Sequence, residues 1–181
     1  MDSSRQPGSR LVLMRHAKSD YPWGVDDHDR PLNDRGRRDA PALGTWLDGH
    51  VTWEDGAATR VLVSTARRAQ LTWGLARAQL SGRWDEVDVL DEPRIYEASV
   101  ASLKDVIAEV PAGTRTLVMV GHNPGLVELI MMLARPDELR AEATAKFRTS
   151  AVAVLTSDLQ LTDAVAQSHA FRVAEFAVPR G

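Results

Sequence analysis

The sequence of 181 residues has no cysteine, few aromatic residues and no long hydrophobic run. The lack of cysteine excludes disulfide bonds, thiolate catalysis and cysteine metal sites, and it fits a cytoplasmic location. The N-terminal stretch is polar and no segment approaches the roughly 20 apolar residues of a membrane span. We therefore expect neither a signal peptide nor a membrane partner.

The sequence also lacks a large excess of either charge, because the formal net charge is −3 at pH 7. This balance gives no reason to expect a nucleic-acid partner, so any cationic site must be local. The length suits one domain with a proper core and is short for two. We expect a flexible tail over residues 1–9 and one domain over residues 10–181.

Short aliphatic runs alternate along the chain with longer segments of helical period. This alternation predicts an α/β fold, a single three-layer α/β/α domain with a mostly parallel central sheet. Val100, Leu103, Ile107 and Val110 form one stripe of an amphipathic helix, with Ser99 as its cap. The pattern leaves the direction of the last two strands open, and the predicted strands are residues 11–14, 60–64, 87–90, 116–120, 151–155 and 172–177.

Three segments have a less regular pattern. The helix predicted over residues 33–47 contains Pro41, which predicts a kink or a late start. Residues 20–30 and 135–146 are polar or charged and weakly patterned, as irregular connections are. By contrast, the apolar helix after His122 has a well-marked start, with Asn123 as the N-cap and Pro124 in the first helical position.

Arginine and histidine residues follow three of the predicted strands. Arg15 and His16 follow the first, Arg68 comes shortly after the second, and His122 follows the run 116–120. Because the carboxyl ends of parallel strands converge on one crevice, we expect a cationic pocket there. Guanidinium groups match phosphate oxygens, and an imidazole with a pKa near ~6.5 is mostly neutral at pH 7 and thus nucleophilic. The set predicts that His16 attacks phosphorus without a metal or other cofactor.

Each of these motifs alone has an ordinary structural interpretation. An Arg-His pair after a strand is usually a salt bridge or capping pair, a Gly-His-Asn segment is usually a helix cap, and Arg67 with Arg68 is usually a solvated helix face. Their joint occurrence at three successive strand ends favours the catalytic interpretation.

Four segments together resemble the histidine phosphatase superfamily, and within it the small bacterial phosphohistidine phosphatases similar to SixA. Residues 15–17 (Arg-His-Ala) are similar to its Arg-His-Gly signature, and residues 64–69 (Ser-Thr-Ala-Arg-Arg-Ala) to its Ser-Pro-x-x-Arg-Ala segment. Residues 30–36 resemble an Arg-Pro-Leu-Thr-x-x-Gly segment, and residues 121–124 the late Gly-His. The resemblance runs from residue 11 to about residue 156 and implies a phosphoglycerate mutase-like fold.

The resemblance also implies roles for individual residues. It makes His16 the phosphorylated nucleophile, makes Arg15, Arg68 and His122 phosphate ligands, and makes Arg30 a further ligand. We assign substrate binding to Asn123 as well.

The general acid is not fixed by these motifs. In the mutase-like branch a glutamate follows the second arginine segment, and in the phytase-like branch an aspartate follows the second histidine. Asn123 stands at the latter position here, so Glu97 is the best candidate, with a solvated carboxylate at a helix start as the alternative. A phosphohistidine substrate needs less acid assistance because imidazole is a better leaving group than an alkoxide.

Residues 26–29 (Asp-Asp-His-Asp) invite a metal interpretation, but they lack a ligand spacing, and we expect a solvated loop and no metal. Trp46 and Trp73 lie in predicted helices and are expected in the core or at its boundary. Trp23 lies in the loop after His16, where we expect it to line the mouth of the site.

The sequence thus predicts a metal-independent phosphatase that works through a phosphohistidine enzyme intermediate, on phosphohistidine in a protein substrate. No insertion is long enough for a separate lid domain, which favours a shallow cleft. Two alternatives remain, a phosphatase of a small phosphorylated metabolite and a non-catalytic phosphate-binding module. The presence of all four strand-end residues argues against the second.

Overall fold

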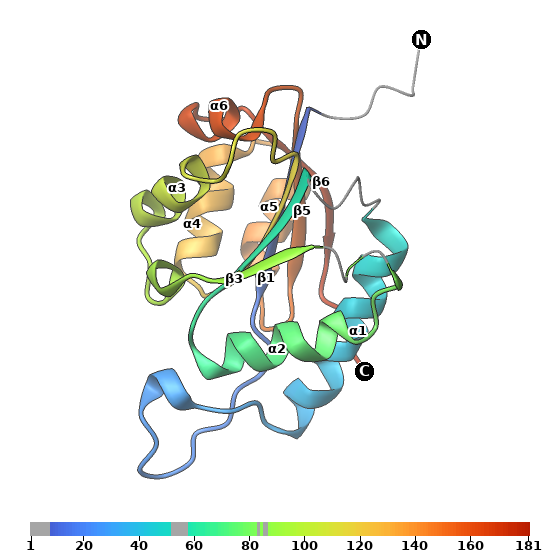
Figure 1. Ribbon diagram of the computed structural model, residues 1–181, viewed down its shortest axis with the longest axis vertical. Helices are drawn as coiled ribbons and strands as arrows, with labels where there is room; N and C mark the ends of the chain where they lie inside the picture. Colours follow the sequence, from blue (N-terminus) through green and yellow to red (C-terminus); the bar gives the residue numbers. More distant parts are fainter. Residues whose placement is uncertain (1–7, 52–57, 83, 85–86) are drawn as a thin grey trace.

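A six-stranded sheet forms the centre of the computed structural model, which describes residues 8–51, 58–82, 84 and 87–181 (Figure 1). The strand order is β3-β2-β4-β1-β5-β6. All strands run in one direction except β5, which is antiparallel to both of its neighbours. The strands are β1 (Ser9–Arg15), β2 (Thr59–Val63), β3 (Asp88–Asp91), β4 (Thr116–Gly121), β5 (Val152–Ser157) and β6 (Arg172–Ala177).

The structure confirms the predicted α/β fold and the mostly parallel sheet. It also settles the two open strand directions, because β5 is reversed and β6 is parallel to β1. Strand β1 begins at Ser9, inside the stretch predicted as a tail, so Ser9 belongs to the sheet and is buried. Residues 1–7 of that stretch lie outside the described residues.

Helices cover both faces of the sheet (Figure 1). Helices α1 and α2 pack on one face, and α3, α4, α5 and α6 pack on the other. The helices are α1 (Asp34–His50), α2 (Arg67–Arg77), α3 (Val100–Ala108), α4 (Gly125–Leu133), α5 (Glu138–Lys146) and α6 (Leu161–Ala166), with short 3₁₀ turns η1 (Asp27–Asp29) and η4 (Pro93–Ile95).

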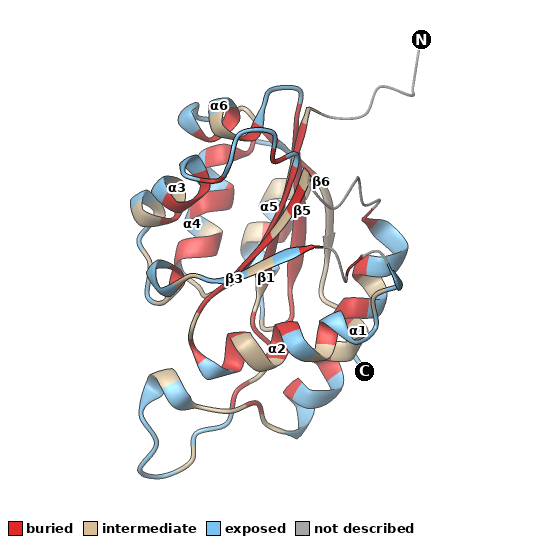
Figure 2. Ribbon diagram, in the orientation of Figure 1, coloured by how far each residue is buried: buried red, intermediate tan, exposed pale blue. Residues whose placement is uncertain are grey.

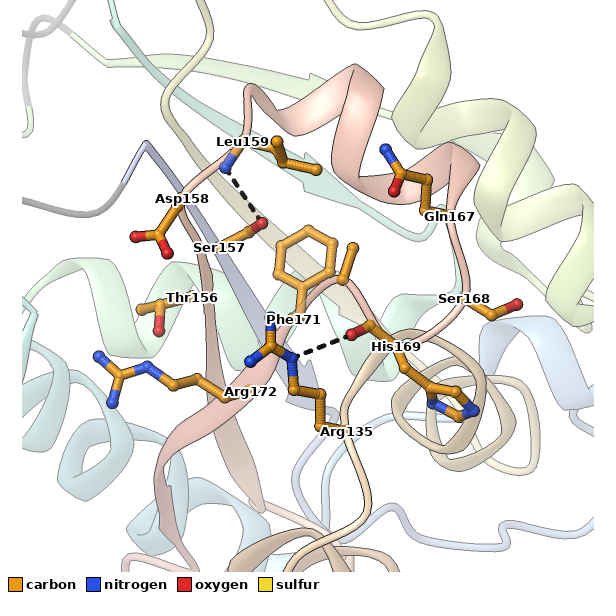
Figure 3. A pocket seen from close by; sticks show the side chains of 11 residues that line it. Arg135, Thr156, Ser157, Asp158, Leu159, Gln167, Ser168, His169, Phe171 and Arg172 are labelled. Atoms are coloured by element: carbon orange, nitrogen blue, oxygen red, sulfur yellow. Dashed lines mark hydrogen bonds between the residues drawn. The ribbon is translucent and has the colours of Figure 1, made fainter.

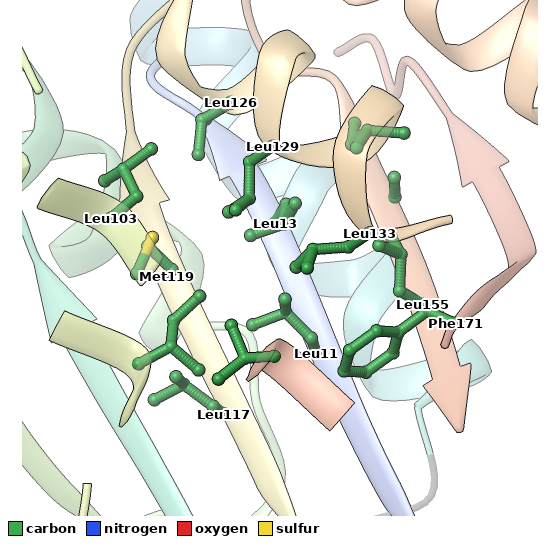
Figure 4. Packing of buried hydrophobic residues seen from close by; sticks show 14 of the residues in the cluster. Leu11, Leu13, Leu103, Leu117, Met119, Leu126, Leu129, Leu133, Leu155 and Phe171 are labelled. Atoms are coloured by element: carbon green, nitrogen blue, oxygen red, sulfur yellow. The ribbon is translucent and has the colours of Figure 1, made fainter. Parts of the chain in front are cut away.

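The central strands are buried on both faces (Figure 2). Successive side chains of a strand point to opposite faces, so β1 supplies both halves of the core. Leu11 and Leu13 pack under α3 and α4 (Figure 4), whereas Val12 and Met14 pack under α1 and α2. This two-sided core fixes the ends of β1 and its neighbours, where the predicted chemistry lies.

Two expectations about the helices are wrong. Residues 135–146 are not an irregular connection, because α5 forms there with the Asp137 side chain accepting from the Arg140 amide. Helix α1 does not start late despite Pro41, because Asn33 caps it by accepting from the Gly36 amide. The Asp137 cap defines a start of α5 that the periodicity does not reveal, whereas α1 starts where the helix over residues 33–47 was predicted to begin.

In the part of the chain that the structure describes, no helix is both long enough and apolar enough to cross a membrane.

Candidate active site

The carboxyl ends of β2, β4 and β1 lie side by side, because these three strands are consecutive neighbours in the sheet and run parallel. The sheet pairing continues past the strands: the Ser64 amide donates to Val120 O at 3.0 Å, and the His16 amide to Gly121 O at 3.1 Å. The rings of His16 and His122 come to lie 5.0 Å apart between centroids. The predicted convergence of the strand-end residues is therefore present.

The His16 ring is held with one nitrogen free for chemistry. Its Nδ1 lies 2.7 Å from the carbonyl oxygen of Ala17. A carbonyl only accepts hydrogen bonds, so Nδ1 carries the proton and Nε2 presents its lone pair. His16 is 8% exposed, and this burial lowers its pKa to about 3, with a smaller lowering from His122, Arg68 and Arg15. The ring is consequently neutral across the physiological range.

His122 is also neutral. Burial, together with the charge of Arg68, lowers its pKa to about 4. Its Nε2 is 2.8 Å from the Ser64 hydroxyl, and its Nδ1 is buried with no hydrogen-bond partner among the described residues. Buried polar atoms without a partner are rare in native proteins and occur where a group has a catalytic role.

Arg15 and Asn123 meet at the carbonyl oxygen of Phe147. Arg15 Nη1 donates to it at 3.0 Å and Asn123 Nδ2 at 2.8 Å. Burial lowers the pKa of Arg15, although a guanidinium keeps its charge at any physiological pH. Arg15 Nε and Asn123 Oδ1 are buried and have no hydrogen-bond partner among the described residues.

The predicted helix cap at Asn123 is wrong. Helix α4 begins at Gly125 with Pro124 as its N-cap residue, and no side chain caps it. The amide of Asn123 is used across the site by Phe147 instead, which draws the residue toward the end of β1.

Arg68 lies in the first turn of α2, 6% exposed, whereas its neighbour Arg67 is exposed. Its Nη1 donates to the backbone oxygen of Asp27 at 2.6 Å and its Nη2 to Asp27 Oδ2 at 3.0 Å. Residues 26, 27 and 29 are exposed, as expected for a solvated loop, but the Asp27 side chain also pairs with Arg68. The spacing of three residues to Arg30 was a signal for an ion pair in this loop, but nothing in the pattern indicated Arg68.

Arg30 is anchored by all three of its guanidinium nitrogens. Nε donates to Asp20 O at 3.0 Å, Nη1 to Asp27 Oδ1 at 2.6 Å, and Nη2 to the Ser19 hydroxyl. The guanidinium also stacks on Tyr21, 3.6 Å from the ring centroid. These contacts fold residues 19–30 over the end of the sheet, and the role of Arg30 as a phosphate ligand stays a prediction.

Tyr96 is also part of the site, although no motif in the sequence indicated it. Its hydroxyl donates to Asp27 Oδ2 at 2.9 Å, and its ring packs edge-on against His122 at 5.8 Å and against His28 at 4.9 Å. Partial burial and the bond to Asp27 raise the pKa of Tyr96, so it stays a donor.

Glu97 is exposed and makes no hydrogen bond or ion pair within the described part of the chain. Its φ of 51° lies in the left-handed region, which non-glycine residues adopt at a cost of about 1–3 kcal/mol and which is common at functional sites. It follows Tyr96 directly in the sequence, and the ring of Tyr96 packs against His122. Its role as an acid stays a prediction.

Two of the three tryptophans whose location was predicted lie where we expected them, and one does not. Trp73 is buried and Trp46 packs partly buried against the same core, as predicted. Trp23 is 100% exposed, so it does not pack into the mouth of the site and instead projects into solvent.

A cavity of about 570 Å³ lies elsewhere, at the opposite end of the sheet (Figure 3). It is lined by the end of β5, by Arg135 and by the segment around His169, and it contains none of the predicted site residues. The cluster at the strand ends is thus distinguished by its chemistry and not by its volume. It joins two neutral imidazoles to the guanidinium groups of Arg15 and Arg68, a combination suited to an anion.

The family is shown by comparison with known proteins. The model of the histidine phosphatase superfamily (branch 1) matches residues 11–166, which is most of the chain. The chain therefore belongs to this superfamily, and its fold is phosphoglycerate mutase-like, as predicted.

Among its relatives, the chain is 39% identical to the uncharacterized protein Rv1276c of Mycobacterium tuberculosis over 146 residues, covering 78% of this chain and 85% of that one. Two solved structures are similar over nearly their whole length. A candidate phosphohistidine phosphatase SixA from Nakamurella multipartitia has a TM-score of 0.80 and 30% identity, covering 96% of this chain and 99% of that one. A SixA candidate from Agrobacterium tumefaciens has a TM-score of 0.74 and 26% identity, covering 97% and 100%.

Proposed function

We propose that this phosphatase transfers the phosphoryl group of its substrate to His16 Nε2 and then to water. The observation that carries the proposal is the hydrogen bond from His16 Nδ1 to Ala17, which leaves Nε2 unprotonated beside Arg15, Arg68 and His122. A neutral, buried imidazole next to fixed cationic groups has the nucleophile and the charge stabilisation that phosphoryl transfer needs.

In the first step, the Nε2 lone pair forms a bond to phosphorus while the bond from phosphorus to the leaving group breaks. The leaving group departs with the electron pair and takes up a proton, from Glu97 acting as the acid or from solvent water. In the second step, water attacks the phosphorus, the bond to His16 breaks, and phosphate and neutral imidazole are regenerated. Arg15, Arg68 and His122 stabilise the charge on the phosphoryl oxygens in both steps.

A protein carrying phosphohistidine is the substrate that we favour. Three of the seven large hydrophobic side chains that are exposed in the described chain lie within five residues, in the loop that leads to Asp27: Tyr21 at 69%, Trp23 at 100% and Val25 at 38%. Exposed tyrosine and tryptophan are typical of surfaces that bind proteins. The names of the similar SixA structures support the same substrate class.

The reaction that we propose uses no metal. The guanidinium groups of Arg15 and Arg68 supply the positive charge that a divalent cation supplies in other phosphatases. The cysteine-free sequence also fits a cytoplasmic location for the reaction.

The experiment that tests the function is a hydrolysis screen with a phosphohistidine protein, phosphorylated sugars and p-nitrophenyl phosphate, with and without prior EDTA treatment. We expect the phosphohistidine protein to be the best substrate and the rates to survive EDTA. A sugar phosphate hydrolysed far faster would favour the metabolite alternative, and activity restored by one divalent cation would contradict metal independence. No hydrolysis of any substrate would leave a phosphate-binding module.

A further inference from the structure

The carboxylate of Asp27 joins three side chains that come from separate parts of the chain. Its Oδ1 accepts from Arg30, and its Oδ2 accepts from Arg68 at 3.0 Å and from the Tyr96 hydroxyl at 2.9 Å. The backbone oxygen of Asp27 accepts a further bond from Arg68 at 2.6 Å. A single residue therefore holds both terminal nitrogens of Arg68.

This two-point contact fixes the plane of the Arg68 guanidinium, since a group held at both terminal nitrogens cannot turn about its long axis. Arg68 is nearly buried, and Asp27 is the carboxylate that pairs with it. Donors that are fixed before the substrate arrives stabilise developing charge without reorganisation. The orientation of Arg68 thus depends on Asp27.

Asp27 is itself held firmly, although its side chain is 47% exposed. It opens the 3₁₀ turn η1, and Arg30 anchors the surrounding loop. Partial burial raises the pKa of Asp27, but the Tyr96 hydroxyl and the charges of Arg68 and Arg30 outweigh it and leave the pKa below its usual value. The carboxylate is therefore charged at neutral pH.

A carboxylate beside a phosphate-binding arginine can have one of two opposite effects on activity. It promotes catalysis if it orients the arginine, and it inhibits substrate binding if it occupies the place of the phosphate. A mere stand-in for phosphate needs only the contact with Arg68. Asp27 also binds Arg30 and Tyr96 and contributes its backbone oxygen, so it is built into the loop. We propose that Asp27 is a positioning residue that orients Arg68 toward the transferred phosphoryl group, an inference that rests on the proposed function.

The variant Asp27→Asn keeps the size and the backbone oxygen but removes the charge. We expect kcat for p-nitrophenyl phosphate to fall by about 10- to 100-fold, less than on removal of a donor itself, with KM changed less than about threefold. Asp26→Asn is the matched control, because Asp26 is an exposed neighbour whose side chain makes no cap bond to η1. It should stay within about twofold of wild type.

Tyr96→Phe removes one donor to Asp27 with little change in shape. We expect kcat to fall about threefold, and no further loss in the double variant with Asp27→Asn, because both changes act through one carboxylate. Equal kcat in the Asp27→Asn and Asp26→Asn variants would overturn the proposal. A raised kcat with tighter inhibition by inorganic phosphate would also overturn it, and would make Asp27 a competing anion.

One measurement is independent of turnover. In ¹⁵N NMR of the full chain, a guanidinium clamped at both Nη atoms rotates slowly and gives resolved Nη signals. We expect such signals for Arg68 in wild type and their collapse in Asp27→Asn. Identical Arg68 spectra would refute the positioning role even if the protein hydrolysed none of the substrates, whereas that inactivity alone would refute only the proposed function.

Discussion

The floor and the rim of the candidate site are built differently. The floor consists of Arg15, His16, Arg68 and His122, which are buried or nearly so and follow strands that the sheet aligns. The rim consists of residues 19–30 together with residues 96 and 97. These residues are mostly exposed, and Asp27, Arg30 and Tyr96 among them are held by side-chain hydrogen bonds. The floor is therefore suited to chemistry that needs dry, fixed groups, and the rim to choosing and orienting a substrate.

Arg68→Ala is expected to have the largest effect and tests the floor. Removing one preorganised donor to developing charge typically costs roughly 10²–10³ in rate. Arg67→Ala should stay near wild type because that side chain is exposed at the surface of α2. Steady-state kinetics on p-nitrophenyl phosphate measures both variants, and the reverse order would mean that the segment holds phosphate through Arg67.

The depressed histidine pKa values predict acid sensitivity of folding. Below pH 6.5 both histidines become protonated in the unfolded chain. In the folded protein, His16 and His122 stay neutral until the pH falls to about 3 and about 4, respectively. Stability is therefore lost as the pH falls through this window, by about 1.4 kcal/mol per pH unit for each histidine.

Urea unfolding of wild type and His16→Asn between pH 7 and 4.5 measures this slope. We expect a shallower decline in the variant. Equal pH dependence of the free energy of unfolding in the two proteins would show that water reaches His16 more readily than its burial indicates.

Glu97→Gln tests the rim and separates the two classes of substrate. Acid assistance contributes around 10²–10⁴ when the leaving group is a poor one. We expect a loss of about 10-fold or more on an alkyl phosphate and a loss below about threefold on phosphohistidine, provided that wild type hydrolyses both. Small and equal losses of rate on both substrates would show that Glu97 is not the general acid.

Trp23→Ala is expected to have the smallest effect, confined to a protein substrate. Loss of one aromatic contact at a protein interface that is not a hot spot costs roughly 1 kcal/mol in binding. We expect KM to rise about 5- to 10-fold for a phosphohistidine protein and to stay unchanged for p-nitrophenyl phosphate.

Leu159→Ala is the matched control, since Leu159 is an exposed apolar residue at the opposite end of the sheet. Equal changes for both substrates in Trp23→Ala would place the effect in the site and not in docking.

The same contrast governs what the sequence could predict. The sequence predicted the aliphatic strands, their alternation with helices and the residues that follow β1, β2 and β4. It could do so because the pairing of the strands in the sheet fixes the positions of their ends. The contacts of Asp27 and Tyr96 were not predicted, because they join residues 69 positions apart through side chains that no periodicity marks. The failed cap at Asn123 has the same cause, since its amide is bound by a distant carbonyl.

The central claim is that His16 carries the phosphoryl group. Rapid acid-free quenching of the enzyme with ³²P-labelled substrate tests it most directly. We predict an acid-labile, base-stable adduct that maps to His16 and is absent from His16→Ala. A labelled adduct that persists in that variant, or that maps to another residue of the wild type, would contradict the account.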